Sequence, residues 1–160
     1  MKRFHRSRLR DARGTSLVEA ALITPLLVLL TLSVVDFGLM FYCQLALENG
    51  VSQATRFAVT GNVKDDPANP GNPLSRTDSI KLAMRQATPT LTIADGAFSF
   101  NHMALGGGAW IAGTGGPQEI EKVTINYTWT FFNPMMWPFF PNGQIRLTVD
   151  SAMKNESRFQ

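Results

Sequence analysis

The sequence is poor in the residues that most enzyme active sites and disulfide-stabilised domains require. Its 160 residues include one cysteine, Cys43, and two histidines, His5 and His102. A single cysteine excludes an internal disulfide, so any folded domain must be held together by packing. We expect Cys43 to be an apolar helix residue, with an intermolecular disulfide as the alternative. The sequence also lacks zinc-ligand spacing, a nucleotide-binding loop and a haem motif. We therefore predict a protein that is not an enzyme and has no cofactor or metal.

Three features that superficially resemble functional motifs have simpler explanations. His102 follows a predicted strand and has no acidic neighbour in the sequence, so neither catalysis nor metal binding is expected there. Asp65 and Asp66 lie in a proline-rich segment, where we expect solvated carboxylates. The glycine-rich segment 106–117 lacks the lysine and the strand-to-helix setting of a phosphate loop. It is expected to be a flexible connection.

Positive charge is concentrated at the N-terminus. Residues 1–14 carry a net charge of +5, whereas the remainder of the chain carries −2. A nucleic-acid-binding surface needs its basic groups on the folded part of the protein, so no nucleic-acid partner is expected. Basic residues directly before an apolar segment instead predict a membrane orientation with the N-terminus in the cytoplasm.

The segment from Ala20 to Val35 has 16 residues without a charge. Glu19 and Asp36 flank it and are about 26 Å apart along a helix. Both carboxylates would then lie near the edges of a hydrocarbon core about 30 Å thick. No small-x-small cleavage site follows Val35, which favours a membrane anchor over a cleaved secretory signal. Pro25 predicts a kink in this helix. We expect a basic leader at 1–14, a transmembrane helix at 15–43 and an extracytoplasmic domain at 44–160.

Two helices are expected to contribute to an α+β outer domain. The first would run past the membrane towards Thr60, with a bend or break at Asn49-Gly50 because glycine in a helix costs roughly 1 kcal/mol relative to alanine. Residues 61–76 are rich in turn formers and predict a loop. A second helix fits residues 78–87, with Thr77 as its N-cap. Its apolar stripe favours packing on a sheet.

Alternating apolar residues predict three or four antiparallel strands. Residues 91–93 and 98–100 would form a hairpin around an Asp95-Gly96 turn. Longer strands are expected at 123–131, with Trp129 on the core face, and at 145–153. The two helices would cover the apolar face of this sheet.

Residues 133–141 form an apolar segment that is too rich in proline for a central strand. We expect it to fold back over the open end of the sheet. The alternative is contact with a partner or a membrane, because exposed apolar patches usually mark such contacts.

The start of the apolar segment resembles the class III signal of type IV prepilins. Residues 13–22 read R-G-T-S-L-V-E-A-A-L, in which Gly14 ends the basic leader and Glu19 is the fifth residue after it. In prepilins a membrane peptidase cuts after the glycine, and the acid is fifth in the mature chain. The resemblance implies cleavage between Gly14 and Thr15, and pairing of Glu19 with the N-terminal amine of another subunit during assembly. The simpler alternative is a glutamate that snorkels into the headgroups.

Residues 36–59 are similar to the TadE-like family of tight-adherence pilus proteins. The family typically has an acid-Phe-Gly step, here Asp36-Phe37-Gly38, although Glu is more usual at the first position. Its next helix ends in Arg-aromatic-Ala, here Arg56-Phe57-Ala58. Residues 152–156, A-M-K-N-E, resemble the family's closing Arg-Asn-Glu, with Lys154 where Arg is usual.

This resemblance implies a membrane-anchored minor pilin or pseudopilin of a tight-adherence (Flp-type) pilus or a related secretion apparatus. The protein would lie in the bacterial inner (cytoplasmic) membrane, with its outer domain periplasmic or extracellular. Its expected partners are membrane lipid, a prepilin peptidase, other pilins or pseudopilins and the pilus assembly platform. The alternatives are a signal-anchored binding or chaperone-like module that does not enter a filament, and an anchored enzyme.

Overall fold

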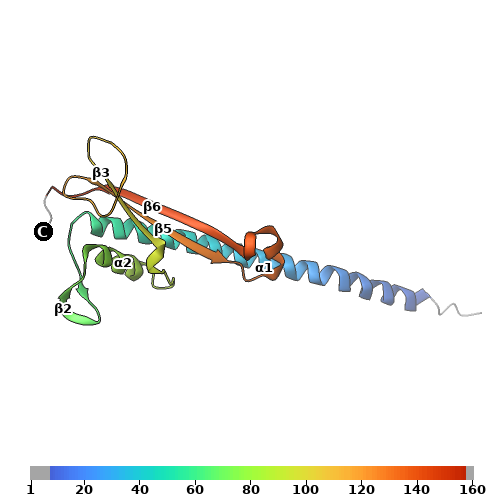
Figure 1. Cartoon of the computed structure of the whole chain (residues 1–160). Coiled ribbons are helices and arrows are strands. Elements are labelled where there is room, and N and C mark those ends of the chain that lie inside the picture. The colour runs from blue at the N-terminus through green and yellow to red at the C-terminus, as the bar shows by residue number, and fades with distance from the viewer. Residues whose placement is uncertain (1–7, 158–160) are drawn as a thin grey trace, which may run out of the picture.

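The first helix, α1, extends from Arg8 to Ala58 and is 51 residues long (Figure 1). The computed structural model describes residues 8–157, with side chains from Gly14 onwards. Residues 1–7 of the basic leader, including His5, thus lie outside the described residues. The helix continues through Pro25 without interruption, and the hydroxyl groups of Thr31 and Ser33 donate to carbonyl oxygens one turn earlier. A kink at Pro25 stays a prediction.

The break expected at Asn49-Gly50 is wrong, because α1 continues through both residues. Gly50 is buried where a second helix crosses α1. A Cβ atom added there would lie 2.5 Å from Cγ2 of Thr88 and 2.8 Å from Sδ of Met84. The glycine therefore permits a close approach between helices, and packing outweighs its low helix propensity.

The second helix, α2, extends from Arg76 to Ala87. Its N-cap is Ser75, whose hydroxyl accepts a hydrogen bond from the backbone of Asp78, so the assignment of Thr77 as the cap is wrong. Both candidates are hydroxyl residues directly before the helix, which explains the error. The apolar stripe of α2 packs mainly on α1 and not on the sheet.

The main sheet has four antiparallel strands in the order β4-β3-β5-β6. Its strands are β3 (Phe98–Met103), β4 (Ile111–Ala112), β5 (Ile120–Thr130) and β6 (Gln144–Lys154). The long hairpin of β5 and β6 runs along α1, which also packs against α2 (Figure 1). The expected α+β architecture and the two long strands are confirmed.

Two connecting segments differ from expectation. Residues 91–93 do not form a strand: the carbonyl of Ile93 accepts from Arg85, and a 3-10 turn, η1 (Asp95–Ala97), leads directly into β3. The expected loop at 61–76 contains a small ribbon of β1 (Asp65–Asp66) and β2 (Asn69–Pro73).

The core lies between α1, α2 and one face of the sheet. The alternation predicted for β5 and β6 is confirmed, because Val123, Ile125, Leu147 and Val149 are buried. Trp129, expected on the same core face, is only half-buried. Other buried apolar residues come mostly from one side of α1 and from α2: Met40, Cys43, Leu47, Val51, Ala54, Ala58, Ile80, Met84, Ile93 and Phe131.

Candidate functional sites along the membrane helix

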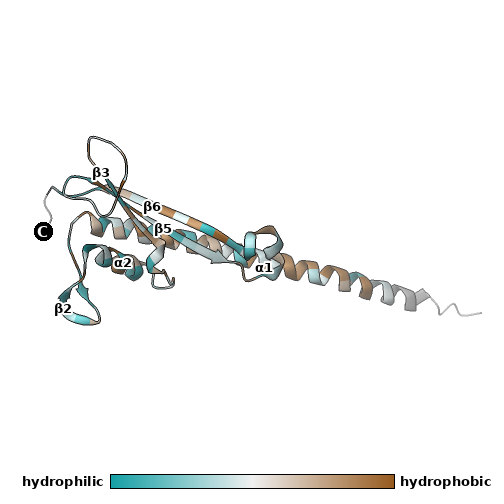
Figure 2. Ribbon diagram, viewed as in Figure 1, coloured by the Kyte–Doolittle hydropathy of each residue, from teal (hydrophilic) through white to brown (hydrophobic). Residues whose placement is uncertain are grey.

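Residues 14–35 of α1 are mostly apolar and are largely uncovered by the other described residues. One helix among the described residues is long and apolar enough to cross a membrane, and its most apolar window has a mean hydropathy of 2.2. None of that window is buried, and Figure 2 shows hydrophobic residues along this projecting segment. Apolar residues all around a helix require an apolar environment, which a bilayer supplies.

Gly14, Thr15 and Glu19 lie within this uncovered part of α1, and all three are exposed. A Cβ atom added to Gly14 would meet no atom within 4 Å, so packing within the described residues does not require glycine there. Glycine also weakens a helix. The fold therefore gives no reason for Gly14, and its proposed role in cleavage stays a prediction, as does the role of Glu19 in assembly.

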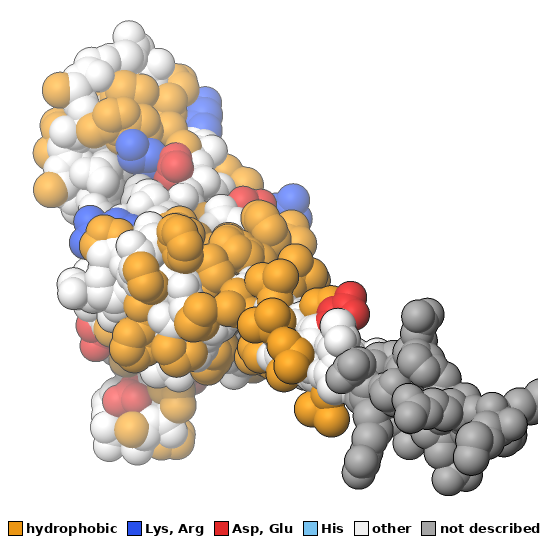
Figure 3. Space-filling model, turned by 90° about the vertical axis from the view of Figure 1, so that its right-hand side faces the viewer, with side chains coloured by type: hydrophobic (Ala, Val, Ile, Leu, Met, Phe, Trp, Pro, Cys, Tyr) orange, Lys and Arg blue, Asp and Glu red, His pale blue; other side chains and the backbone are white. Residues whose placement is uncertain are grey.

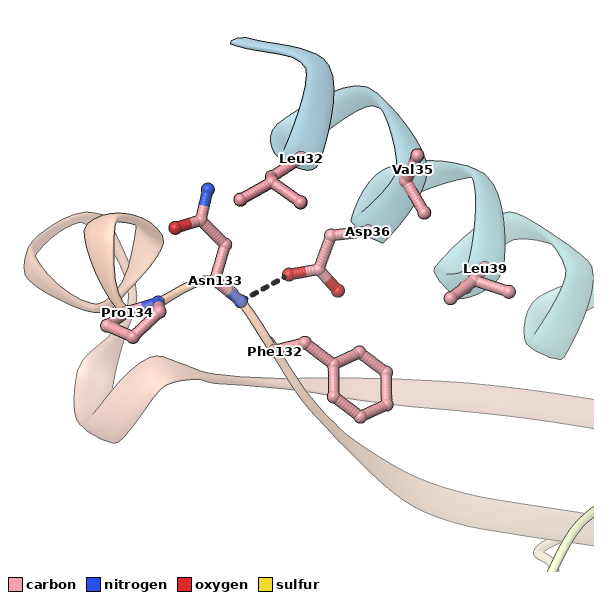
Figure 4. Close-up of a pocket in the computed structure, with 7 residues that line it drawn as sticks. All are labelled: Leu32, Val35, Asp36, Leu39, Phe132, Asn133 and Pro134. Carbon is pink, nitrogen blue, oxygen red and sulfur yellow. Dashed lines mark hydrogen bonds between the residues drawn. The ribbon is translucent and has the colours of Figure 1, made fainter. Parts of the chain in front are cut away.

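Asp36 lies where α1 first meets the outer domain, and it is 2% exposed. The backbone N–H of Asn133 donates to Oδ2 of Asp36 over 3.0 Å, and the two residues are 97 positions apart in the chain (Figure 4). The side-chain amide of Asn133 donates to the hydroxyl of Ser33 over 3.2 Å. These bonds connect the far end of the β5–β6 hairpin to the end of the uncovered helix segment.

An apolar pocket of about 400 Å³ adjoins this junction. Figure 4 shows α1 and the segment after β5 on its two sides. It is lined by Asp36 and Asn133 and by the apolar residues Leu32, Val35, Leu39, Phe132 and Pro134. Oδ1 of Asp36 is buried and has no hydrogen-bond partner among the described residues. The lining suits a hydrocarbon group better than a charged ligand.

Residues 131–143, hereafter the hairpin tip, connect β5 to β6. The tip contains two 3-10 helices, η2 (Pro134–Phe139) and η3 (Pro141–Gly143). The ring of Phe37 on α1 contacts those of Phe131 and Phe140, with centroids 5.5 Å and 6.5 Å away. The segment expected to fold back over the sheet thus packs against α1 at the end of the hairpin.

Residues 14–56 match the model of the family described as TadE-like protein. This part of the chain is TadE-like. The match extends from Gly14 through Glu19 and Asp36 to Arg56, so it includes both the uncovered segment and most of the packed segment of α1. TadE-like proteins are a structural family associated with the Tad pilus, and the match suggests a component related to that pilus. No curated protein and no solved structure matches the chain.

Beyond the TadE-like match, the closing motif of the chain meets the end of α1. The backbone N–H of Glu156 donates to the carbonyl of Val59, and Asn155 is 2% exposed. The amide side chain of Asn155 donates to the carbonyl of Gly116. The resemblances noted at 56–58 and 152–156 are thus adjacent in space, and together they fix the end of the sheet on the end of the helix.

A buried ion pair reinforces this end of the outer domain, outside the TadE-like match. Nη2 of Arg76 lies 2.5 Å from Oε2 of Glu121, whose side chain is fully buried. Arg76 also donates to the carbonyls of Ala58 and Gly115. Burial raises the pKa of Glu121, and the nearby Arg76 cation opposes that rise. Arg76 therefore supports three separate segments, which indicates a structural role.

The remaining candidate residues do not combine into a site. Nε2 of His102 lies 3.9 Å from Oε2 of Glu119, and its Nδ1 lies 3.2 Å from the carbonyl oxygen of Gly113. Cys43 is 1% exposed within the core, as expected for an apolar helix residue. Among the side chains that the structure describes, no group of three or more His, Cys, Asp or Glu is placed to hold a metal ion. Asp66 instead accepts hydrogen bonds within its own turn.

Proposed function

We propose that the protein is a membrane-anchored minor pilin or pseudopilin-like component of a tight-adherence (type IVb, Flp-type) pilus or a related secretion apparatus. One observation carries the proposal: an uncovered apolar helix segment has Gly14 and Glu19 near its start, and the same helix continues unbroken into a packed outer domain. The match to TadE-like proteins over 14–56 supports it. The protein would lie in the bacterial inner membrane, with its N-terminus cytoplasmic and its outer domain periplasmic or extracellular.

The proposed division keeps a leader at 1–14, a transmembrane helix at 15–43 and an outer domain at 44–160. Residues 36–43 would belong to the transmembrane helix and would also pack against the outer domain. Met40 and Cys43 face the core, whereas Leu39, Phe41 and Tyr42 are exposed on the other sides of the helix. The helix would thus leave the bilayer gradually, with lipid on one face and the outer domain on the other.

Processing by a prepilin peptidase would explain why glycine stands at position 14, where packing does not require it. Cleavage between Gly14 and Thr15 would remove the basic leader and make Glu19 the fifth residue. A carboxylate at the start of an apolar helix is costly in lipid and usually has a partner. We propose the N-terminal amine of a neighbouring subunit as that partner. Other pilins or pseudopilins and the assembly platform would then be its partners in the membrane.

Mass spectrometry of the membrane-extracted protein tests the processing step. In cells with an active prepilin peptidase, the wild-type chain should begin at Thr15, and Gly14→Val should retain the leader. Gly38→Val is a matched control, because a Cβ at Gly38 also meets no atom within 4 Å. It should be cleaved normally. A wild-type chain that still begins at Met1 or Lys2 would end the pilin proposal.

Filament incorporation tests the role of Glu19 separately. Glu19→Ala should be cleaved but should be lost from purified filaments, and Glu19→Asp should give an intermediate amount because its carboxylate reaches one methylene less far. Glu48→Ala changes an exposed glutamate in the same helix and should be incorporated normally. Normal incorporation of Glu19→Ala would show that Glu19 is not needed for assembly. Absence of the wild-type chain from purified filaments would instead favour the alternative, an anchored binding or chaperone-like module that does not enter a filament.

A further inference from the structure

We propose that the hairpin tip enters the outer lipid–water interface beside α1, so that both the transmembrane helix and this tip hold the outer domain at the membrane. The inference rests on the proposed membrane anchor but does not depend on processing or filament assembly. Its ligand is the bilayer itself, at the boundary between headgroups and acyl chains.

The composition of the tip fits this environment. Residues 123–145, which include the whole tip, contain no charged residue. Four large apolar side chains of the tip are exposed: Phe132 (73%), Met135 (55%), Trp137 (51%) and Phe139 (76%). Apolar surface costs about 25 cal/mol per Å² when it contacts water, so this concentration in one segment indicates a contact.

The position of the tip identifies lipid as that contact. Asn133 connects the tip to Ser33 and Asp36, directly at the end of the uncovered part of α1. Asp36 is about 26 Å along the helix from Glu19, close to the thickness of a hydrocarbon core. With Glu19 at the inner edge, the tip lies level with the outer edge.

The apolar surface of the tip is also continuous with that of the helix. Leu32 and Val35, which face outward on α1, line one pocket together with Phe132 and Pro134 of the tip. Figure 3 shows hydrophobic side chains gathered across this end of the molecule, next to the projecting helix. A bilayer that covers the exposed face of α1 would cover the adjoining tip without any rearrangement.

Many backbone N–H groups of the tip already have hydrogen-bond partners, which suits an environment with little water. The three prolines of the tip have no N–H group, and several other backbone N–H groups donate within the tip or to α1, including those of Phe131, Asn133, Met135, Met136, Phe140 and Gly143. The indole N–H of Trp137 donates to the carbonyl of Phe131 over 3.1 Å. Satisfied backbone groups and amphipathic aromatic rings are the features that suit the membrane interface.

Spin-label accessibility in the full chain tests the proposal. In a Cys43→Ala background, single cysteines replace Phe139 in the tip, Leu30 in the uncovered helix segment, and Val63, an exposed residue of the outer domain. Each variant is labelled with a nitroxide and reconstituted at a low protein-to-lipid ratio in vesicles of phosphatidylethanolamine and phosphatidylglycerol. Collisions with oxygen, which concentrates in lipid, are compared with collisions with a water-soluble nickel complex.

The oxygen-to-nickel collision ratio should be several-fold higher at Phe139→Cys than at Val63→Cys, and highest at Leu30→Cys. Phe132→Cys provides a second tip position, and circular dichroism checks folding. A tip label as accessible to nickel as the label at Val63→Cys would overturn the proposal while leaving the anchor intact. A tip label shielded from both reagents would also overturn it, because it would indicate a protein contact. Nickel access at Leu30→Cys would overturn the anchor itself.

Discussion

The two halves of α1 have the same regular backbone but opposite surroundings. Residues 14–35 are exposed on nearly every side, whereas residues 36–58 bury one face against the sheet and α2. Buried positions in the second half lie on one face of the helix, three or four residues apart or, at 50/51 and 54/55, next to each other: Asp36, Met40, Cys43, Leu47, Gly50, Val51, Ala54, Thr55 and Ala58. The distribution of apolar residues around a helix, more than their number, indicates what covers it.

The unbroken join between these halves has a mechanical consequence for the proposed pilin. A helix of 22 residues is about 33 Å long, so residues 14–35 can span a hydrocarbon core of about 30 Å. Because no loop separates the halves, the direction of the helix in the membrane sets the direction of the outer domain. The contacts of Asn133 with Ser33 and Asp36 would strengthen this coupling.

The largest difference between the halves should appear when a leucine is truncated in each. Leu47 is fully buried in the core, whereas Leu27 is 61% exposed on the uncovered segment. Leu47→Ala should cost about 4 kcal/mol of unfolding free energy, because it leaves a cavity. Leu27→Ala should change the stability of the outer domain by less than about 0.5 kcal/mol. Denaturant unfolding in mild detergent, followed by near-UV circular dichroism, measures both. Equal losses would show that the halves do not differ as described.

The next largest effect concerns the ion pair at the end of the packed half. Arg76→Met should cost about 3 kcal/mol at neutral pH, because it leaves the carboxylate of Glu121 buried without its cation. Since burial raises the pKa of Glu121, the folded state holds this proton more tightly than the unfolded state does. Stability therefore falls as the pH rises from the ordinary glutamate pKa through the raised value. Without Arg76 that fall should be steeper.

Unfolding free energies measured between pH 4 and pH 8 test whether stability falls as the pH rises. The Arg76→Met variant should be closest to the wild type at the acid end. Adding Glu121→Gln should remove most of the extra pH dependence, because glutamine does not ionise. A pH dependence that survives in the double variant would have to come from another group.

Local patterns account for the parts of the structure that the sequence predicts well. Strands β5 and β6 are long enough for their alternation to identify the core face, and the helix signals before Asp78 indicate α2 to within two residues. Residues 91–93 alternate in the same way but follow a turn, in which the N–H of Leu91 donates to the carbonyl of Thr88. They serve as a connection, and the carbonyl of Ile93 accepts from Arg85. A pattern of three residues cannot report whether a partner strand is present.

The junction at Asp36 was not predictable from local pattern, because its partner Asn133 is 97 positions away. The sequence predicts that Asp36 lies near the membrane edge, and residues 133–141 stand out as apolar and rich in proline. No local pattern joins the two. The same limit applies to Gly50. Its helix-weakening effect can be predicted locally, but glycine is required there by the side chains of Met84 and Thr88, which are distant in the sequence.

Replacing Gly38 and Gly50 with alanine should change the unfolding free energy in opposite directions. Gly38→Ala should stabilise by up to about 1 kcal/mol, because a Cβ there meets nothing within 4 Å and alanine favours the helix. Gly50→Ala has the same propensity gain, but its Cβ would lie 2.5 Å from Cγ2 of Thr88. Overpacking of this kind costs about 1–3 kcal/mol, so the net change should be a loss of about 1 kcal/mol.

A second substitution tests whether that contact is the cause. Thr88 is buried and its hydroxyl donates to the carbonyl of Met84, so its methyl group cannot simply rotate away. Thr88→Ser removes the methyl group and keeps the hydroxyl. In the Gly50→Ala background it should therefore recover much of the lost stability, whereas in the wild-type background it should only lose buried methyl contacts. Denaturation midpoints of the four proteins in one detergent give the interaction energy directly. If the two changes are additive, the methyl group of Thr88 is not what requires glycine at position 50.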